Sequence, residues 1–367
     1  MLHLPSLEND RASLDAPKAI DDQKFRIFKL AQSCTAEYGN IFANTGTELA
    51  DIQAQMTISI NRVNTVYEID LAIQLQFVAN NDQIIYFGNT NTDPWSNEWN
   101  TMTAQTIDAA IGVNNYDIGH NFNTEGGGNA GCIGCVCLSS SQSGTHKGRG
   151  YTGRSNPTGD PFDIDYVAHE MGHQFGGYHT QSNDDCRSGS GATEVEPGSG
   201  SSIMGYAGIC AADVQNNSDA HFNYVNIRDI SANIKPGGNS TCANEISSTN
   251  NTPTADAGAD YVIPRSTAFI LEGTATDADG MSSLTYNWSQ NDPEDPNSNS
   301  APPSTRTQGP MYRSILPTTS PNRYMPEIAQ VLNGNLTPTW EVTPSVARNM
   351  EFAFMVRDNE MNGAQTA

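Results

Sequence analysis

The first half of the chain switches between two hydrophobic periods. Between residues 52 and 67, apolar side chains recur at steps of three and four residues, which places them on one face of a helix. From Leu71 to Phe77, apolar and polar residues alternate, as they do in a half-buried strand. Similar patterns predict strands over 25–30 and 116–122 and a helix over 98–111. Strands that alternate with helices indicate an α/β sheet.

The second half of the chain follows a different pattern. After Asp163, one helix is followed by long loops rich in glycine and serine and by a closing helix near 225–234. Residues 247–253 are mostly Ser, Thr and Asn, which is the composition of a linker. Beyond them, three short apolar runs separated by Gly, Pro, Asn and Asp predict strands of a β-sandwich. The runs are 261–263, 268–271 and 284–288.

These patterns divide the chain into four segments. A length of 367 residues exceeds that of an ordinary single domain, so two domains are expected. We expect a tail or propeptide remnant at 1–24 and an α/β domain at 25–245. A linker at 246–252 then leads to a β-sandwich at 253–367, which we expect to be incomplete.

The chain is strongly acidic. Its formal net charge is −23, from 41 acidic and 18 basic residues. Such a field repels nucleic acid and anionic membranes, so neither is expected as a partner. No apolar run reaches the roughly 18 residues that span a bilayer. Part of the acidity would suit Ca2+, although solubility is the simpler explanation, and we expect a monomer.

Seven cysteines all lie in the first 242 residues, which indicates one domain stapled by disulfides and a secreted protein. They are Cys34, Cys132, Cys135, Cys137, Cys186, Cys210 and Cys242. The cluster at 132–137 also admits a metal site, but no second CxxC completes four ligands. The first residues lack the apolar core of a signal peptide. We expect both ends to be truncated, so this does not argue against secretion.

The segment from His169 to His179 carries the clearest candidate chemistry. His169 and His173 stand at positions i and i+4 of a helix, so both imidazoles can reach one metal ion. Glu170 lies about 100° round the helix, where its carboxylate reaches the water of that ion rather than the ion itself. Gly176 permits a left-handed bend that brings His179 back as a third ligand.

Three protein ligands and one open position are what catalytic zinc requires. Zinc lowers the pKa of a bound water from about 15.7 to near 7, and Glu170 would act as general base and then return the proton to the leaving amine. The sequence therefore predicts a Zn2+-dependent hydrolase with protein or peptide substrates. Three solvated or core histidines are the alternative, and the complete pattern argues against it.

The run HExxHxxGxxH, together with Ser202-Ile203-Met204-Gly205-Tyr206, resembles the metzincin zinc proteases and their Met-turn. Within that clan, residues 159–168 and 196–200 look similar to bacterial reprolysin-like enzymes, distant relatives of the ADAM proteases. The resemblance covers roughly 25–245. It implies a secreted zinc endopeptidase with a mixed, mostly parallel twisted sheet and a long active-site helix, and it makes Met204 the hydrophobic floor under the histidines.

The resemblance also implies roles around the metal. Substrate would lie antiparallel to an edge strand within 126–134, for which Gly128, Ala130 and Gly131 are the candidates, although these residues fit an ordinary loop equally well. Tyr206 has the spacing found in astacins and serralysins, where the phenol binds zinc or steadies the oxyanion. The alternative is a buried tyrosine beneath the site. Thr180 departs from animal reprolysins, which usually have aspartate after the third histidine.

By the same resemblance, Cys137 would pair with Cys242 and Cys186 with Cys210, which leaves the other three cysteines unassigned. Residues 256–288 resemble PKD-like modules, that is, Ig-like sandwiches, in secreted bacterial proteins. Asp277 and Asp279 in that module would hold calcium or simply form a solvated turn.

Two other functions remain open at this stage. One is a catalytically inactive adhesin or binding protein, and the other is a zinc amidase of narrow specificity. The intact set of His169, Glu170, His173 and His179 favours an active protease, because a site that has lost its activity usually loses one of these residues.

Overall fold

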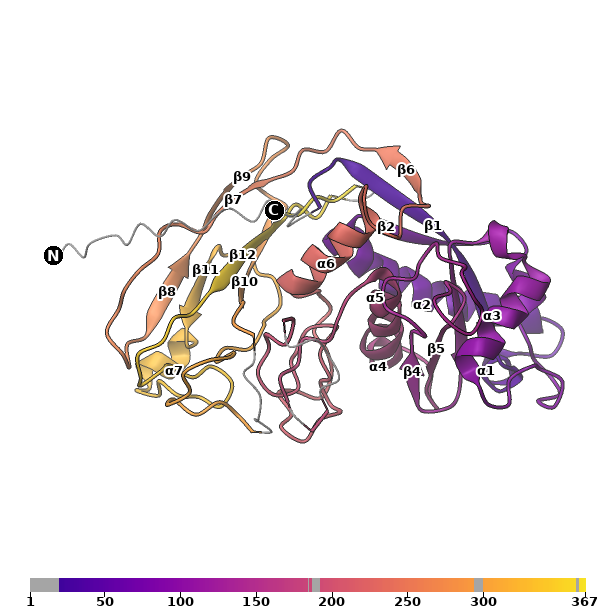
Figure 1. Cartoon of the computed structure of the whole chain (residues 1–367), viewed down its shortest axis with the longest axis horizontal. Coiled ribbons are helices and arrows are strands. Elements are labelled where there is room, and N and C mark those ends of the chain that lie inside the picture. The colour runs from indigo at the N-terminus through magenta and orange to yellow at the C-terminus, as the bar shows by residue number, and fades with distance from the viewer. Residues whose placement is uncertain (1–19, 184, 187–191, 294–299, 361–362) are drawn as a thin grey trace.

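A six-stranded sheet forms the centre of the N-terminal part of the molecule (Figure 1). The computed structural model describes residues 20–183, 185–186, 192–293, 300–360 and 363–367. The strands follow the order β2-β1-β3-β5-β4, and β6 pairs with the free part of β1. Their bounds are β1 Lys24–Cys34, β2 Ile73–Phe77, β3 Ile118–Asn123, β4 Gly127–Asn129, β5 Gly150–Gly153 and β6 Asn244–Ser247. β1, β2, β3 and β5 are parallel, whereas β4 and β6 run antiparallel, so the sheet is mixed and mostly parallel, as expected.

Helices cover both faces of this sheet. The apolar stripe of α2 (Glu48–Leu71) packs with Phe28 and Leu30 of β1 in the main core, which also contains side chains of the helix over residues 160–175 and of α6 (Tyr224–Ile234). Ala31 points the other way, into a smaller core with Ile107 of α3 (Trp99–Ala110). The alternation of side chains along β1 therefore supplies both cores. The short elements are α1 Ala36–Phe42, η1 Asn81–Ile84 and η2 Val113–Asn115.

The active-site helix runs without a break from residue 160 to residue 175, but it is not uniform. It begins as α4 (Asp160–Phe162), widens into a π-helical segment, η3 (Asp163–Ala168), and continues as α5 (His169–Phe175). The Tyr67 hydroxyl of α2 donates to the Ala168 carbonyl at 2.7 Å, at the point where the π-helix ends. π-Helical turns recur at functional sites because they change the direction of the side chains that follow.

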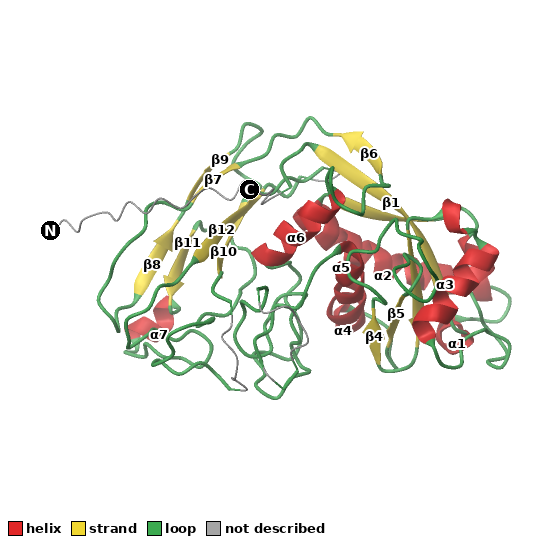
Figure 2. Ribbon diagram, viewed as in Figure 1, coloured by secondary structure: helices red, strands yellow, loops and turns green. Residues whose placement is uncertain are grey.

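The C-terminal part consists of short antiparallel strands and loops (Figure 2). The pairs are β7 (Thr254–Asp256) with β9 (Thr274–Thr276), β8 (Phe269–Glu272) with β11 (Asn322–Met325), and β10 (Thr285–Gln290) with β12 (Phe352–Arg357). One short helix, α7 (Ile328–Leu332), accompanies them. The predicted strands at 268–271 and 284–288 correspond to β8 and β10. The predicted strand at 261–263 is wrong: this run has no regular structure and Tyr261 is 82% exposed, so no second layer covers it.

The segments expected as tail and linker belong partly to the folded body. Residues 1–19 lie outside the described residues, but Ile20 is fully buried and its amide donates to Thr366 Oγ1 at 3.0 Å. The expected linker at 246–252 begins inside β6, where Ile246 pairs with Phe25 of β1. The low hydrophobicity of these segments concealed this, because a single apolar side chain, Ile20, joins the main core and the other contacts cited here are hydrogen bonds.

A buried ion pair joins the two parts of the chain. Arg357 of β12 donates from Nε to Asp70 of α2, and both side chains are almost completely buried. The other Asp70 oxygen accepts the Phe222 amide at 2.6 Å, and Arg357 Nη2 donates to the Phe222 carbonyl at 3.1 Å. Met355 of β12 also belongs to the main core.

We predict that Arg357→Leu lowers the free energy of unfolding by about 3–5 kcal/mol, because it leaves the Asp70 carboxylate buried without its cation. Arg62→Leu is the matched control: Arg62 pairs with Asp160 at 2.7 Å, but both side chains are partly exposed. Its loss should cost about 0–1 kcal/mol. Urea titration followed by tryptophan fluorescence measures both, and equal losses would contradict the importance of the buried pair.

Candidate active site

A glycine turn at the end of α5 brings the third histidine to the first two. Gly176 has φ of 113°, in the left-handed region that a side chain rarely tolerates. Its amide and that of Gly177 close the helix by donating to the carbonyls of His173 at 2.9 Å and Gly172 at 2.8 Å. The chain then reverses and places His179 against the face of α5 that carries the other two imidazoles.

The three imidazoles converge on one point. His179 Nε2 lies 3.1 Å from Nε2 of His169 and 2.9 Å from Nε2 of His173. The Nδ1 atom of His169 lies 2.7 Å from the Ile203 carbonyl, and that of His173 lies 2.7 Å from the Gly177 carbonyl. A carbonyl only accepts, so both Nδ1 atoms carry the proton and both Nε2 atoms present lone pairs.

This arrangement fits a zinc ion. A tetrahedral ion with Zn–N bonds of about 2.0–2.1 Å sets its nitrogens roughly 3.3 Å apart, close to the separations observed. Two lone pairs face His179 Nε2, which has at most one proton to share, so hydrogen bonding alone does not account for the convergence. Among the described residues, these histidines are the one group of three His, Cys, Asp or Glu side chains close enough to hold a metal.

Burial sets the protonation of the site. It lowers the pKa of His173 to about 4 and that of His179 to about 3, with the neighbouring His173 adding to the shift at His179. It likewise lowers the pKa of His169 well below its usual value. The imidazoles are therefore neutral at pH 7, which is the form that binds metals. Burial acts in the opposite direction on Glu170, whose pKa rises to about 8.

The Met-turn lies directly beneath α5. Met204 is fully buried, and a Cβ added at Gly172 would stand 2.6 Å from its sulfur, so the glycine lets the turn approach the helix. The Met204 carbonyl accepts the Thr180 amide at 3.1 Å, next to the third histidine. Met204 therefore lies against the helix that carries His169 and His173.

A buried carboxylate that sequence reasoning missed organises the Met-turn. Glu196 is 1% exposed, and its oxygens accept from the amides of Ser201 at 3.1 Å and Ser202 at 3.2 Å. Thr180 Oγ1 donates to Glu196 Oε2 at 2.6 Å. Thr180, which stands where animal reprolysins usually have aspartate, thus pairs with the carboxylate of Glu196. Only its long-range contacts identify Glu196, which the sequence presents as part of a loop.

The edge of the sheet forms the opposite wall of the site. A cleft of about 560 Å3 is lined by residues 128–133 on one side and by the side chains of the motif on the other. The motif side comprises Glu170, His173, Tyr178, His179 and Tyr206. β4 is the last strand in the sheet order, so Gly128 lies at an open edge, with Ala130 and Gly131 just beyond it. The candidate edge strand is therefore a real strand, although only 127–129 form ladder pairs.

Glu170 contacts this edge strand. Its carboxylate accepts a hydrogen bond from the backbone of Ala130. A Cβ added at Gly128 would lie 2.6 Å from Glu170 Cγ, so glycine is required for this approach. Tyr206 lies beside the third histidine, with its ring centroid 4.5 Å from that of His179. It is half-exposed and lines the cleft, so the alternative of a buried tyrosine beneath the site is wrong.

Three disulfides surround the site. Cys137 is joined to Cys242 and Cys186 to Cys210, the two pairs implied by the resemblance. The third, Cys132–Cys135, had no predicted partners and excludes a metal cluster at these cysteines. Between them, the Gly134 amide donates to the His173 carbonyl at 2.9 Å, which ties this loop to the active-site helix. Cys34 is a free, buried thiol.

Calcium finds no support in the described residues. Asp277 and Asp279 make turn contacts instead: Asp277 Oδ1 accepts the Asp279 amide at 2.9 Å, and Asn251 Nδ2 donates to Asp279 Oδ1 at 3.1 Å. This agrees with a solvated turn, the alternative interpretation. Among the described helices, none combines the length and apolar character needed to cross a membrane.

Comparison with known families gives one match. The model of the family described as Metallo-peptidase family M12B, Reprolysin-like, matches residues 25–234, more than half of the chain. Comparison with curated proteins finds no match. The matched region begins at the second residue of β1 and ends with α6, so it contains the active-site helix, the glycine turn and the Met-turn.

We predict that the purified chain binds one zinc ion and that His179→Ala reduces its zinc affinity by more than about a hundredfold, because loss of a ligand exceeds the effect of losing an outer partner. His146→Gln, which changes a buried histidine paired with Asp108 instead, should retain zinc. Competition with a chromogenic chelator measures both affinities. Equal zinc binding by the two variants would contradict this assignment of the metal site.

Proposed function

The chain belongs to the reprolysin-like metallopeptidases of family M12B, and from that premise we propose that it is a secreted zinc-dependent endopeptidase with Glu170 as general base. The observation that carries the proposal is the convergence of three neutral imidazoles beside a buried carboxylate at the base of an open cleft. Three disulfides suit an oxidising, extracellular environment.

The residues of the chain divide the chemical work. When bound by the three histidines, zinc would supply an activated water and polarise the scissile carbonyl. Glu170 accepts a proton from the attacking water at its carboxylate and delivers it to the nitrogen of the leaving amine. Burial raises the pKa of Glu170, so the group is a stronger base once it is ionised, and a zinc ion held by the adjacent histidines would favour the ionised form.

The edge strand β4 suits an extended peptide. One side of β4 pairs with β5, and no strand among the described residues pairs with its other side. A substrate strand added antiparallel there would hydrogen-bond through its backbone, which gives affinity without dependence on side chains. Gly128 places this strand close to Glu170, so a peptide bound along it would pass across the metal position.

Tyr206 is the proposed donor to the developing oxyanion. Its ring lies beside His179 and lines the cleft. A phenol in this place can stabilise negative charge on the carbonyl oxygen, and one such donor contributes about 3–4 kcal/mol in comparable sites.

We predict that Glu170→Gln retains zinc but lowers the rate of cleavage of unfolded casein by at least about 10²–10⁴-fold, since glutamine cannot accept the proton. The assay uses oxidised, activated protein with and without a chelator. If the wild-type protein hydrolyses small amides but leaves casein intact, the result would contradict the endopeptidase and support an amidase of narrow specificity. A zinc-loaded wild type inert towards both would favour a binding protein.

A second prediction concerns the approach of the edge strand. Gly128→Ala should lower kcat at least about tenfold, because its methyl group would collide with Glu170 and displace the general base. Gly126→Ala is the matched control, since a Cβ there meets nothing within 4 Å. Equal kcat values for the two variants on a quenched fluorescent peptide would show that the position of Glu170 does not depend on this contact.

A further inference from the structure

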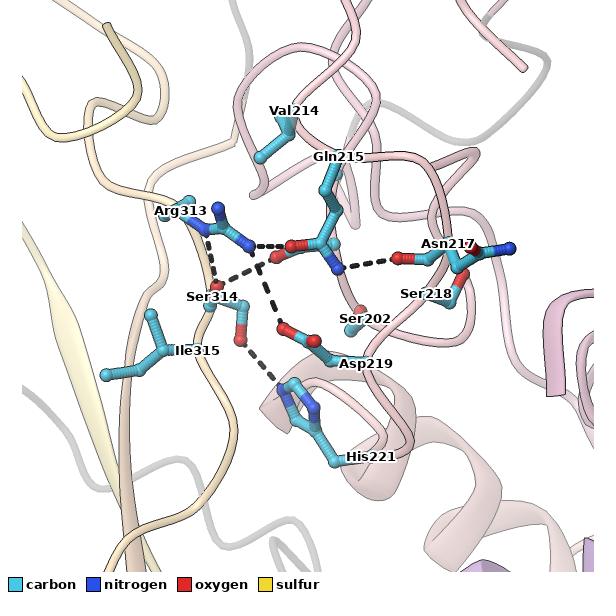
Figure 3. Close-up of polar contacts among 12 residues, drawn as sticks. Ser202, Val214, Gln215, Asn217, Ser218, Asp219, His221, Arg313, Ser314 and Ile315 are labelled. Carbon is cyan, nitrogen blue, oxygen red and sulfur yellow. Dashed lines mark hydrogen bonds and ion pairs between the residues drawn. The ribbon is translucent and has the colours of Figure 1, made fainter. Parts of the chain in front are cut away.

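The C-terminal part of the chain contacts the loop that carries the Met-turn. Figure 3 shows Arg313, Ser314 and Ile315 on one side of this contact and Gln215, Asp219 and His221 on the other. The contact lies far along the chain from the zinc motif, and the family match ends before residue 313. These residues therefore add something to the site that the family motif does not contain.

Ser314 makes two buried hydrogen bonds across this contact. Its hydroxyl lies 2.9 Å from His221 Nε2, and its carbonyl accepts from Ser201 Oγ at 2.8 Å. His221 is buried, and its other ring nitrogen, Nδ1, has no hydrogen-bond partner among the described residues. The Ser314 hydroxyl is thus the group that satisfies this ring, and its loss would leave a buried imidazole without a partner.

The backbone of His221 holds the Met-turn. The His221 carbonyl accepts the Ile203 amide at 3.1 Å, and the Ser201 carbonyl accepts the Asp219 amide at 2.7 Å. Ile203 is the residue whose carbonyl meets Nδ1 of the first zinc ligand, His169, at 2.7 Å. Three hydrogen bonds therefore connect Ser314 to His169. The Ser314 hydroxyl bonds the His221 ring, the Ile203 amide donates to the His221 carbonyl, and the His169 ring bonds the Ile203 carbonyl.

Other contacts hold the same loop along its length. Arg313 donates to Gln215 Oε1 and lies 3.8 Å from Asp219 Oδ2. Trp340 packs so closely on Gly198 that a Cβ there would stand 2.7 Å from its ring. The loop between residues 198 and 222 thus borders the C-terminal part at its start, its middle and its end, where Arg357 reaches the Phe222 carbonyl.

We propose that Ser314 is a positioning residue for the zinc site, and that docking of the C-terminal part sets the Met-turn in the place where Ile203 orients His169. The hydrogen bond of the Ile203 carbonyl fixes the tautomer and the ring direction of His169, and such outer partners contribute about 10–100-fold to metal affinity. The inference rests on the proposed zinc function for its significance, but the contact itself is independent of catalysis.

The test compares variants of the full chain in two measurements. In metal-free protein, Ser314→Ala should speed amide hydrogen exchange in peptides covering 199–206 by about tenfold or more. In a competition with a chromogenic chelator, its zinc affinity should fall by about 10–100-fold. Ser314→Thr, which keeps the hydroxyl, should restore both values. Wild-type exchange and wild-type zinc affinity in a folded Ser314→Ala protein would overturn the proposal.

Thr366→Val is the matched control, because Thr366 also contributes a buried hydroxyl to a contact between distant segments, but its partner is Ile20. It should leave exchange at 199–206 unchanged, and an equal rise there would overturn the proposal by showing a general loosening.

If Ser314→Ala does not fold, Arg313→Ala decides, since its side chain is 25% exposed and its removal is better tolerated. Faster exchange at 199–206 supports the proposal, and wild-type exchange overturns it. Neither measurement requires catalysis. A chain that binds zinc but does not cleave casein would therefore contradict the proposed endopeptidase activity without affecting this inference.

Discussion

Two hydrogen bonds that imidazole N–H groups donate to backbone carbonyls set the geometry of the site. The Ile203 and Gly177 carbonyls fix the protons of His169 and His173 on Nδ1, and so point two lone pairs at His179. Without a cation these lone pairs repel each other, so a rigid frame must hold them together. Each carbonyl belongs to a loop rather than to the helix, which is why the frame must extend well beyond α5.

Close contacts between the backbone and neighbouring side chains supply that frame. Glycines at 128, 172 and 176 admit Glu170, Met204 and the reversing turn, respectively. Glu196 gathers the amides of the Met-turn, and Tyr67 anchors the end of the π-helical segment. The disulfides add cross-links around the same loops. The site is therefore held mainly by polar contacts to the backbone, with the apolar core behind it.

The sequence predicts what local spacing encodes. The histidines at 169, 173 and 179 lie within one helix and one turn, so their convergence follows from helical geometry, and the amphipathic stripe of α2 identifies its buried face. It does not predict contacts between distant residues. Glu196, Ser314 and the Asp70–Arg357 pair carry no period, and the exposed run at 261–263 looks like a strand because apolar content alone cannot show which surface covers it.

The Asp70–Arg357 pair affects when the molecule can complete its folding during synthesis. Its two members are 287 positions apart, so during synthesis α2 emerges from the ribosome long before the arginine that neutralises its carboxylate. Contacts of such separation form late, because the entropy of closing the intervening loop must be overcome first. The N-terminal part can collapse early around its sheet, but it cannot reach its final state until translation has passed residue 357. Completion of the fold is thus coupled to synthesis of the segment that contains Arg357.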